Sequence, residues 1–404
     1  MNPQELHTLT SLLSLPTAPF REKFVFEFCV EYLTSNKIPF WIDATKNIVV
    51  GVKSKKNYHQ ALSRRTKEPL RFVIAHMDHP GFHGKKWLKQ KGSRHELEII
   101  WHGGSPAKAL RGQRVWISSL EDSSATVFKH EAIISEVKLD SRGRFVKTAR
   151  VFIKKPWWSA PRDRPQAEQL FGAFAFRAPV WQQKKNLYAG GADDIIGVYS
   201  ILATAKQLWK SKHPARHNFV ALLSRAEEVG FIGTIGHFEK ELPKKIRREL
   251  LVLSLEASRT LPGATIGSGP VVRLGDKSNV FDSHYSQALL LASKKALKTR
   301  YQRRIMDGGT CEATAAVAYG FRAVGISVPL GNYHNVSFQG GPDSRASMGP
   351  APEFVNIDDV AGQQSLCFEF IKTRLANKEL VFAKHRKDFK SWLRESRKLL
   401  SVGI

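Results

Sequence analysis

Short, nearly continuous apolar runs alternate along the chain with segments that have the periodicity of a helix. The runs that we expect to form buried strands cover residues 47–52, 70–75, 219–223, 250–255 and 323–328. Helices are expected at residues 21–35, 194–210 and 283–299. A strand that is apolar throughout is buried on both faces, which is typical of a parallel sheet covered by helices. The pattern therefore predicts an α/β fold in which helices sandwich a mixed, largely parallel sheet.

The pattern changes between Asp78 and Asp193. This stretch holds short β-like runs at residues 97–101, 114–117, 131–134 and 149–153, with turn residues between them. Short strands at regular spacing indicate a small all-β unit. We therefore predict a β-rich domain at residues 93–188, inserted into a catalytic α/β domain formed by residues 1–92 and 189–404. The length of the chain agrees with one main domain and a second, smaller one.

Composition narrows the class of protein. With 42% hydrophobic residues the chain can bury a sizeable core. No apolar run reaches the roughly 18 residues that a membrane span needs. The first residues lack a basic region and a following apolar stretch, so we expect a cytoplasmic protein without a signal peptide. The three cysteines are scattered and odd in number, which argues against a disulfide framework and leaves metal binding to histidine and carboxylate side chains.

The chain is also strongly basic. Lys and Arg total 63 against 36 Asp and Glu, which gives a formal net charge of +27. Such an excess points to nucleic acid, an anionic surface or an acidic substrate as partner. A basic host proteome or a general contribution to solubility would give the same composition. The charge also leads to the hypothesis that substrates beginning with Glu or Asp are preferred.

Five short stretches carry carboxylate or metal-binding side chains. They are Ala75-His76-Met77-Asp78, Ala192-Asp193-Asp194, Ala226-Glu227-Glu228-Val229-Gly230, Leu255-Glu256-Ala257 and Tyr333-His334-Asn335. Four of them follow, or directly continue, an apolar run that predicts a strand, and the other opens a helix. Open α/β sheets place their chemistry at the ends of strands. The ordered set suits a hydrolase with two metal ions and is more informative than any single pair.

A hydrolase with two metals needs a bridging carboxylate, terminal histidine and carboxylate ligands, and a further carboxylate as base. We expect His76 and Glu256 to hold the first metal, and Glu228 and His334 to hold the second. Asp193 would bridge the two. Zn²⁺ is favoured by such ligands, and Co²⁺ or Mn²⁺ would also fit them. Two divalent ions, three carboxylates and a bridging hydroxide are together neutral, so the site can be buried at little cost.

Two more carboxylates have expected roles. Glu227 lies beside a ligand but points elsewhere, and is the candidate general base that takes a proton from the bridging water. Asp78 lies two residues beyond His76, on the same side of an extended segment. Its side chain can therefore accept the second ring N–H of His76 and fix the tautomer of that ring.

Each stretch also has an ordinary interpretation. A His-x-Asp sequence is usually a polar turn, and a Glu-Glu pair is usually a solvated helix face. Asp193-Asp194 could simply cap the next helix, a role that is compatible with bridging. Glu256 is harder to explain in this way, because an unpaired carboxylate at the end of a buried strand is costly. His334 has the weakest local support, since an ordinary turn precedes it.

These residues resemble the cytosolic di-metal aminopeptidases that include the glutamyl, deblocking and tetrahedral aminopeptidases. The resemblance covers nearly the whole chain and rests on residues 15–22, 47–51, 76–78, 192–194, 227–230, 308–310, 334 and 358–360. It implies a zinc-exopeptidase-like fold and the same ligands, base and orienting acid that the residues themselves suggest. It also implies a homo-oligomer, from a dimer up to a dodecamer that encloses the active sites, assembled through the inserted domain.

The position of the inserted segment favours this family over its relatives. Related carboxypeptidases and acylases place their extra domain after the fourth metal ligand, whereas the long gap here lies between His76 and Asp193. Two differences stand beside the ligands. The family usually has Asn-Arg after the bridging Asp, where this chain has Asp194-Ile195, and it commonly has Gly-Gly-Thr-Asp, where this chain has Cys311. Both concern substrate preference and oligomer contacts more than metal binding.

Three functions stay open at this point. The first is a metal-dependent aminopeptidase acting on peptides, in which the hydroxide that bridges the metals attacks the carbonyl and Glu227 serves as base. The second keeps the site and changes the substrate, as a deacylase or carboxypeptidase-type amidohydrolase. The third is a basic protein that binds nucleic acid or an anionic surface on an inactive peptidase scaffold. The complete set of candidate ligands favours the first.

Overall fold

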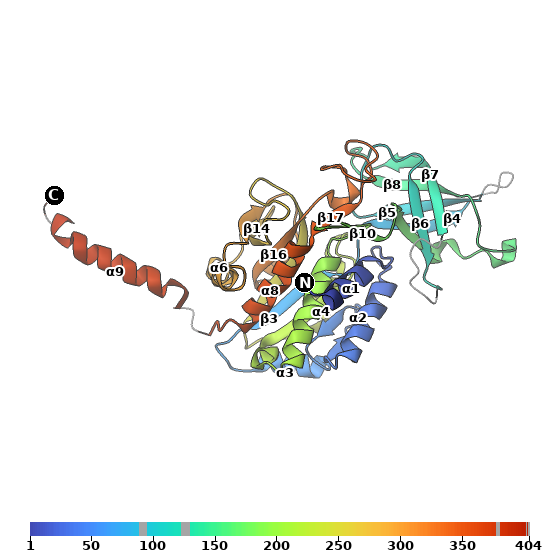
Figure 1. Cartoon of the computed structure of the whole chain (residues 1–404). Helices are drawn as coiled ribbons and strands as arrows, with labels where there is room; N and C mark the ends of the chain where they lie inside the picture. Colours follow the sequence, from blue (N-terminus) through green and yellow to red (C-terminus); the bar gives the residue numbers. More distant parts are fainter. Residues whose placement is uncertain (89–94, 123–129, 377–379, 401, 403–404) are drawn as a thin grey trace.

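A mixed sheet of eight strands forms the centre of the described part of the chain (Figure 1). The structure, a computed structural model, describes residues 1–88, 95–122, 130–376, 380–400 and 402. The strands of the sheet are β1 (Phe40–Ile42), β2 (Ile48–Val50), β3 (Leu70–His76), β12 (Phe219–Ser224), β13 (Leu250–Arg259), β14 (Val271–Asp276), β15 (Gln302–Met306) and β16 (Arg322–Leu330). Their order is β1-β2-β12-β3-β13-β16-β14-β15, and β12, β3, β13 and β16 are mutually parallel. The predicted fold class is confirmed.

Helices cover both faces of this sheet, because side chains of its central strands alternate between two apolar layers. In β3, Val73 and Ala75 pack on one side and Phe72 and Ile74 on the other, all fully buried. The first layer contains α1 (Pro3–Leu13), α2 (Lys23–Ser35), α4 (Ile195–Lys210), α6 (Ser283–Leu297) and α8 (Ile357–Lys372). The second contains α3 (Lys55–Ser63), α5 (Ile232–Glu241) and α7 (Glu312–Ala318). The three predicted helices are present, with ends that differ by one or two residues.

The inserted segment forms a closed β-barrel. Its strands are β4 (Gly81–Trp87), β5 (His95–His102), β6 (Arg114–Ser119), β7 (His130–Leu139), β8 (Val146–Ile153) and β9 (Leu170–Phe174). They close in the order β4-β5-β8-β7-β6-β9, around alternate side chains such as Leu97, Ile99 and Trp101 of β5. The prediction of a small inserted β-rich domain is confirmed. Its strands span residues 81–174, and the domain borders near 92 and 188 stay a prediction.

The barrel packs directly on the α/β domain. Phe24 of α2 stacks on Phe171 of β9 with ring centroids 6.3 Å apart, and Trp116 of β6 belongs to the same buried cluster. Close-packed contacts of this kind resist relative movement. Segments of the barrel can therefore hold a defined position beside the sheet.

A small antiparallel sheet lies next to the main one. It is formed by β10 (Val180–Gln183), β11 (Asn186–Ala189) and β17 (Glu353–Asn356), with β11 in the centre. The first residue of β17, Glu353, is fully buried. Short 3-10 helices occur at η1 (Pro161–Asp163), η2 (Ala167–Gln169), η3 (Pro214–Asn218) and η4 (Tyr333–Asn335).

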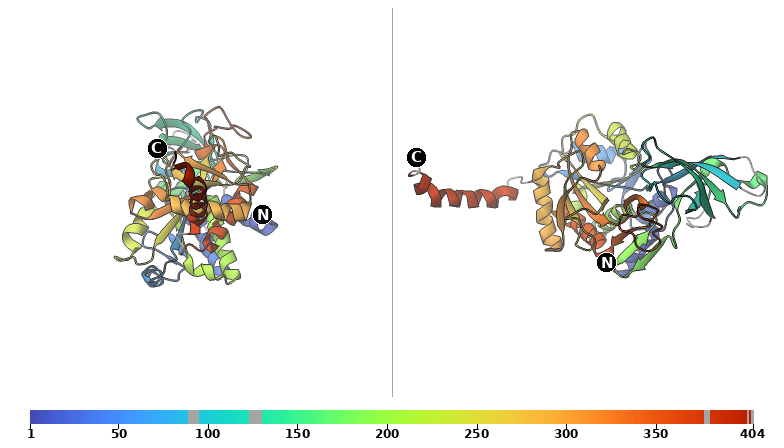
Figure 2. Two further views of the ribbon diagram at one scale, coloured as in Figure 1. Left: turned by 90° about the vertical axis from the view of Figure 1, so that its left-hand side faces the viewer. Right: turned by 90° about the horizontal axis from the view of Figure 1, so that it is seen from above.

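The last helix, α9 (Leu380–Leu400), leaves the body beside α6 and projects away from it (Figures 1 and 2). At its base the ring of Phe382 lies 5.9 Å from that of His284 in α6. None of the helices in the described ranges combines the length and the apolar character that crossing a membrane demands.

Candidate metal centre

The parallel strands bring the candidate residues to one edge of the sheet. His76 is the last residue of β3, Glu256 lies near the end of β13, and Glu227 and Glu228 follow β12. His334 lies in η4, shortly after β16. Because these four strands run in the same direction, their carboxyl ends meet at the same place.

Asp193 lies between the two histidines. It comes just before α4, whose N-cap is Asp194 with its side chain accepting the N–H of Gly197. Oδ1 of Asp193 lies 3.7 Å from Nε2 of His76, and Oδ2 lies 3.8 Å from Nε2 of His334. The peptide bond between Asp193 and Asp194 is cis. The distances show that the two oxygens of one carboxylate face two different histidines, which is the arrangement of a bridging ligand.

Two groups of potential metal ligands share this aspartate. The first consists of His76, Asp193 and Glu256, and the second of Asp193, Glu228 and His334. In each group the ligand atoms lie within 4.8 Å of one another. Two ligand atoms bound to the same tetrahedral zinc ion, each at about 2.0–2.2 Å from it, are roughly 3.4 Å apart. The observed separations therefore suit a common ion in each group.

Unpaired buried atoms point to the same positions. Among the described residues, Oδ1 of Asp193, Oε1 of Glu228 and Nε2 of His334 are buried without a hydrogen-bond partner. Nε2 of His334 lies 3.1 Å from Oε2 of Glu228, but the two groups do not have the geometry of a hydrogen bond. Buried polar atoms are normally paired by hydrogen bonds. Two side chains that lie close together without such a bond can instead both bind one cation placed between them. The set of histidines and carboxylates thus fits two divalent cations.

Burial perturbs the ionisation of the centre. It raises the pKa of Asp193 well above the usual range, and the charges of Glu228 and Glu353 add to this effect. It likewise raises the pKa of Glu227, again with Glu228 contributing. Burial lowers the pKa of His76, which favours the neutral imidazole that binds metals. Bound cations would oppose the carboxylate shifts, because positive charge favours the ionised form.

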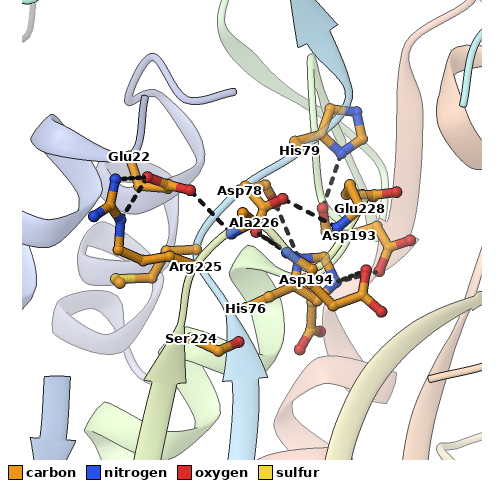
Figure 3. A network of polar contacts seen from close by, with 12 residues as sticks. Glu22, His76, Asp78, His79, Asp193, Asp194, Ser224, Arg225, Ala226 and Glu228 are labelled. Atoms are coloured by element: carbon orange, nitrogen blue, oxygen red, sulfur yellow. Dashed lines mark hydrogen bonds and ion pairs between the residues drawn. The ribbon is translucent and has the colours of Figure 1, made fainter. Parts of the chain in front are cut away.

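The Asp78 carboxylate holds the loop that carries Glu227 and Glu228 (Figure 3). It accepts the N–H of Glu227 at 3.0 Å and that of Glu228 at 3.2 Å. The sequence predicts that this carboxylate accepts the ring N–H of His76. In the structure, Nδ1 of His76 instead lies 3.0 Å from the main-chain carbonyl of Asp78, and the nearest carboxylate oxygen is 3.7 Å away. The Asp78 carboxylate therefore positions the loop, and the hydrogen bond that fixes the ring of His76 goes to the main-chain carbonyl of Asp78.

The same loop is tied down from its other side by Glu22 and Arg225. Nε of Arg225 donates to one oxygen of Glu22 at 2.7 Å, and the N–H of Ala226 donates to the other at 3.0 Å (Figure 3). Ala226 has a φ of 53°, a conformation that is unfavourable for a residue with a side chain. These contacts hold the backbone in that conformation and thereby position the glutamates that follow.

Two residues that the sequence analysis missed position the ligands. One oxygen of Glu353 accepts the N–H groups of residue 192 at 2.7 Å and of Asp193 at 3.2 Å, and its other oxygen accepts that of His334 at 2.8 Å. Nδ1 of His79 lies 2.8 Å from the main-chain carbonyl of Asp193 and donates to it. The histidine directly after the His-x-Asp stretch was a signal available in the sequence. No local pattern marks Glu353, because its partners lie far away along the chain.

The barrel also reaches the centre. Gly104, between β5 and β6, lies against the ring of His334, where an added Cβ would come 2.9 Å from Cγ and Cε1 and closer still to Nδ1. Nε1 of Trp101 donates to the carbonyl of Gly104 at 3.1 Å and holds this segment in place. A side chain at residue 104 would therefore collide with a candidate ligand.

A cavity opens beside Glu256. Its lining residues are Glu256, Ala257, Ser258, Arg259, Leu261, Arg273, Met306, Gly308, Gly309, Thr310 and Tyr333. Arg273 is 3% exposed, so a guanidinium group is buried close to the candidate ligands. Cys311 is fully buried and is not among the residues that line the cavity.

The sheet, the inserted barrel and the paired histidine and carboxylate groups define a metal-dependent hydrolase of the zinc-exopeptidase type. The chain belongs to the M42 glutamyl aminopeptidase family, whose family model matches residues 58–340. The resemblance noted in the sequence is thereby confirmed, and the protein is a member of a family of metalloaminopeptidases. A search of curated protein sequences gave no match.

Solved structures of aminopeptidases have the same fold. A TET aminopeptidase from a marine sediment archaeon of the Thaumarchaeota superposes with a TM-score of 0.69 at 17% identity, covering 94% of this chain and 100% of the other. An aminopeptidase from the archaeon Desulfurococcus kamchatkensis gives 0.66 at 18% identity, covering 94% and 97%. The Pyrococcus horikoshii TET1 peptidase, which assembles into a tetrahedron or a large octahedral shell, gives 0.65 at 16% identity, covering 91% and 99%.

Proposed function

We propose that this chain removes N-terminal residues from peptides with the help of two divalent metal ions. His76 and Glu256 would hold the first ion. Glu228 and His334 would hold the second, and Asp193 would contribute to both. The observation that carries the proposal is that the two oxygens of Asp193 face two different histidines, at 3.7 and 3.8 Å. When bound, the ions would polarise the scissile carbonyl and lower the pKa of the attacking water.

Glu227 is the proposed general base. The residue is 9% exposed, and its carboxylate lies 3.7 Å from Nε2 of His76. The bond from its main-chain N–H to Asp78 keeps this carboxylate next to the ligands. From there it can take a proton from the attacking water and deliver it to the leaving amine. Because Glu227 also groups with His76 and Glu228 as a possible ligand, the test must separate the base from a ligand.

The cavity beside Glu256 is the proposed site for the first side chain of the substrate. It adjoins a proposed ligand, and both Arg259 and Arg273 line it. Two guanidinium groups favour an anionic side chain, which agrees with the hypothesis drawn from the net charge. We therefore expect faster hydrolysis after Glu or Asp than after Lys or Arg. A panel of aminoacyl amides that shows no preference for acidic residues would refute this.

Ion identity and assembly are further parts of the proposal. Zn²⁺ is the favoured ion for two histidines and three carboxylates, with Co²⁺ or Mn²⁺ as replacements that the same ligands accept. The shell formed by the Pyrococcus horikoshii TET1 peptidase supports a homo-oligomer for this chain as well. Sedimentation of the purified protein measures the number of subunits.

The experiment that tests the function combines metal content with hydrolysis of aminoacyl-nitroanilides. We expect about two metals per chain in the wild type. Glu227→Gln should keep both metals and lose at least about 100-fold in kcat, because it removes the base and spares the ligands. The exposed Glu168→Gln of the barrel is the matched control and should behave as the wild type. A Glu227→Gln variant that lacks one metal would make Glu227 a ligand. A protein without metal and without turnover after addition of Zn²⁺, Co²⁺ or Mn²⁺ would refute the proposal.

A further inference from the structure

The helix α9 exposes a continuous apolar face. The rings of Phe382, His385, Phe389 and Trp392 contact one another in succession, so these side chains share one side of the helix. Phe389 is 54% exposed, Trp392 is 60% exposed, and Leu393 beside them is 57% exposed. Apolar surface of this extent on a single helix marks a site of interaction.

The opposite face of α9 is basic. The helix contains seven Lys and Arg residues and two Asp and Glu residues. At about 100° per residue, Lys387, Arg394 and Lys398 lie on the side opposite Phe389. A helix that combines a Trp, Phe and Leu face with a face rich in Lys and Arg has the composition of helices that lie in the plane of a membrane surface.

The position of α9 leaves this face accessible. The helix projects from the body next to α6 (Figures 1 and 2). The metal centre lies at the carboxyl ends of the parallel strands, where Gly104 of the barrel contacts His334. The helix also lies beyond residue 340, where the match to the aminopeptidase family ends. A partner can therefore bind α9 without covering the metal centre.

We propose that α9 docks this protein on an anionic lipid surface. The apolar face would enter the boundary between headgroups and acyl chains, and the basic face would remain in contact with the negative headgroups. Charge complementarity is the argument for the occupant, because α9 carries an excess of five positive charges and the whole chain has a formal net charge of +27. Each Lys or Arg near an anionic surface strengthens binding by roughly fivefold.

Two other occupants fit the helix less well. Nucleic acid would pair with the basic face alone and would leave Phe389, Trp392 and Leu393 in water. A second copy of α9 would pair through a narrow seam of apolar positions. The apolar side chains of α9 instead spread over a broad face that also carries His385 and Ser396, and each copy would bring its own positive charge.

Co-sedimentation of the full-length protein with lipid vesicles tests the proposal. We expect at least about tenfold stronger binding to vesicles of phosphatidylcholine with 30% phosphatidylserine than to phosphatidylcholine alone, and weaker binding in high salt. Trp392→Ser/Leu393→Ser should abolish binding by removing apolar area, and Lys387→Gln/Arg394→Gln should weaken it at least about tenfold. Leu291→Ser/Val280→Ser removes exposed apolar side chains from the body and is the matched control, which should bind as the wild type.

The outcomes separate the occupants. Each of these substitutions lies outside the metal centre, so peptidase activity in solution verifies that the variants are folded. The proposal would be overturned if the wild type did not bind vesicles, or if the Trp392→Ser/Leu393→Ser variant bound them as strongly as the wild type. If the wild type does not bind vesicles and the same variant loses self-association, the occupant is a second copy of the chain. Binding to duplex DNA that the apolar substitutions leave intact, again without vesicle binding, would identify a polyanion. Because peptidase activity is measured separately, failure of this inference is distinguishable from failure of the proposed function.

Discussion

Replacing Gly104 of the barrel with alanine should displace His334 and so weaken binding of the second metal ion. The added Cβ would lie 2.9 Å from Cγ and Cε1 of His334 and closer still to Nδ1. Ordinary van der Waals contact begins near 3.4 Å, so the ring or the glycine segment must move by more than about 0.5 Å. The bond from Trp101 to the carbonyl of Gly104 resists movement of that segment. Metal sites tolerate only about 0.2 Å in ligand distances, so the second ion loses His334 as a well-placed ligand.

We expect Gly104→Ala to bind the second ion at least about tenfold more weakly and to lose roughly 100-fold in kcat/KM. Titration of the metal-depleted protein with Zn²⁺ measures the first quantity, and hydrolysis of an aminoacyl-nitroanilide measures the second. Gly190→Ala is the matched control, because a Cβ at Gly190 meets no atom within 4 Å. Thermal unfolding verifies that both variants are folded. Activity of Gly104→Ala within twofold of the wild type would refute the argument that the barrel holds His334 in place.

Two further substitutions test the buried carboxylates Glu353, beside the centre, and Glu312, at the start of α7. Glu353→Ala leaves two buried N–H groups and one partly buried N–H group without an acceptor, so the free energy of unfolding should fall by about 3 kcal/mol and the affinity for metal should fall with it. Denaturant unfolding measures the first quantity and metal titration the second. A loss of stability below about 1 kcal/mol would contradict this role. Burial raises the pKa of Glu312 to about 8. The folded state therefore keeps a proton that the unfolded state releases near pH 4.5. As the pH rises from about 4.5 to 8, this carboxyl group lowers the free energy of unfolding. Glu312→Gln should therefore gain about 3 kcal/mol over the wild type between pH 4.5 and pH 7, measured by denaturant unfolding of the metal-depleted proteins at each pH. Parallel curves for the two proteins would contradict the shifted pKa.

Several parts of this structure could be predicted from the sequence because they depend on local patterns. The apolar runs at 70–75, 219–223 and 250–255 form the strands β3, β12 and β13, since a strand buried on both faces must be apolar throughout. The run of short strands after Asp78 forms the barrel. His76 and Glu256 stood out for the same reason, because each interrupts or ends an apolar strand and needs a partner there.

Other features depend on contacts between distant segments, which no local pattern records. Glu353 reaches the centre only because β17 pairs with β11 and lies close to η4. Gly104 matters only because the barrel packs on α2 and brings its loop against His334. The sequence also could not show that the ring of His76 lies closer to the main-chain carbonyl of Asp78 than to its carboxylate, because that choice depends on the fold of the loop.

The sequence by itself determined the α/β class, the inserted all-β unit and the chemical type of the candidate site, because burial and ligand chemistry restrict the residue types allowed at each position. Only the tertiary structure decided that the two oxygens of Asp193 face different histidines and that α9 projects from the body with an exposed apolar face. The distances between side chains on separate strands follow from the order, direction and twist of those strands. These properties arise from packing of the whole chain rather than from the residues next to each ligand.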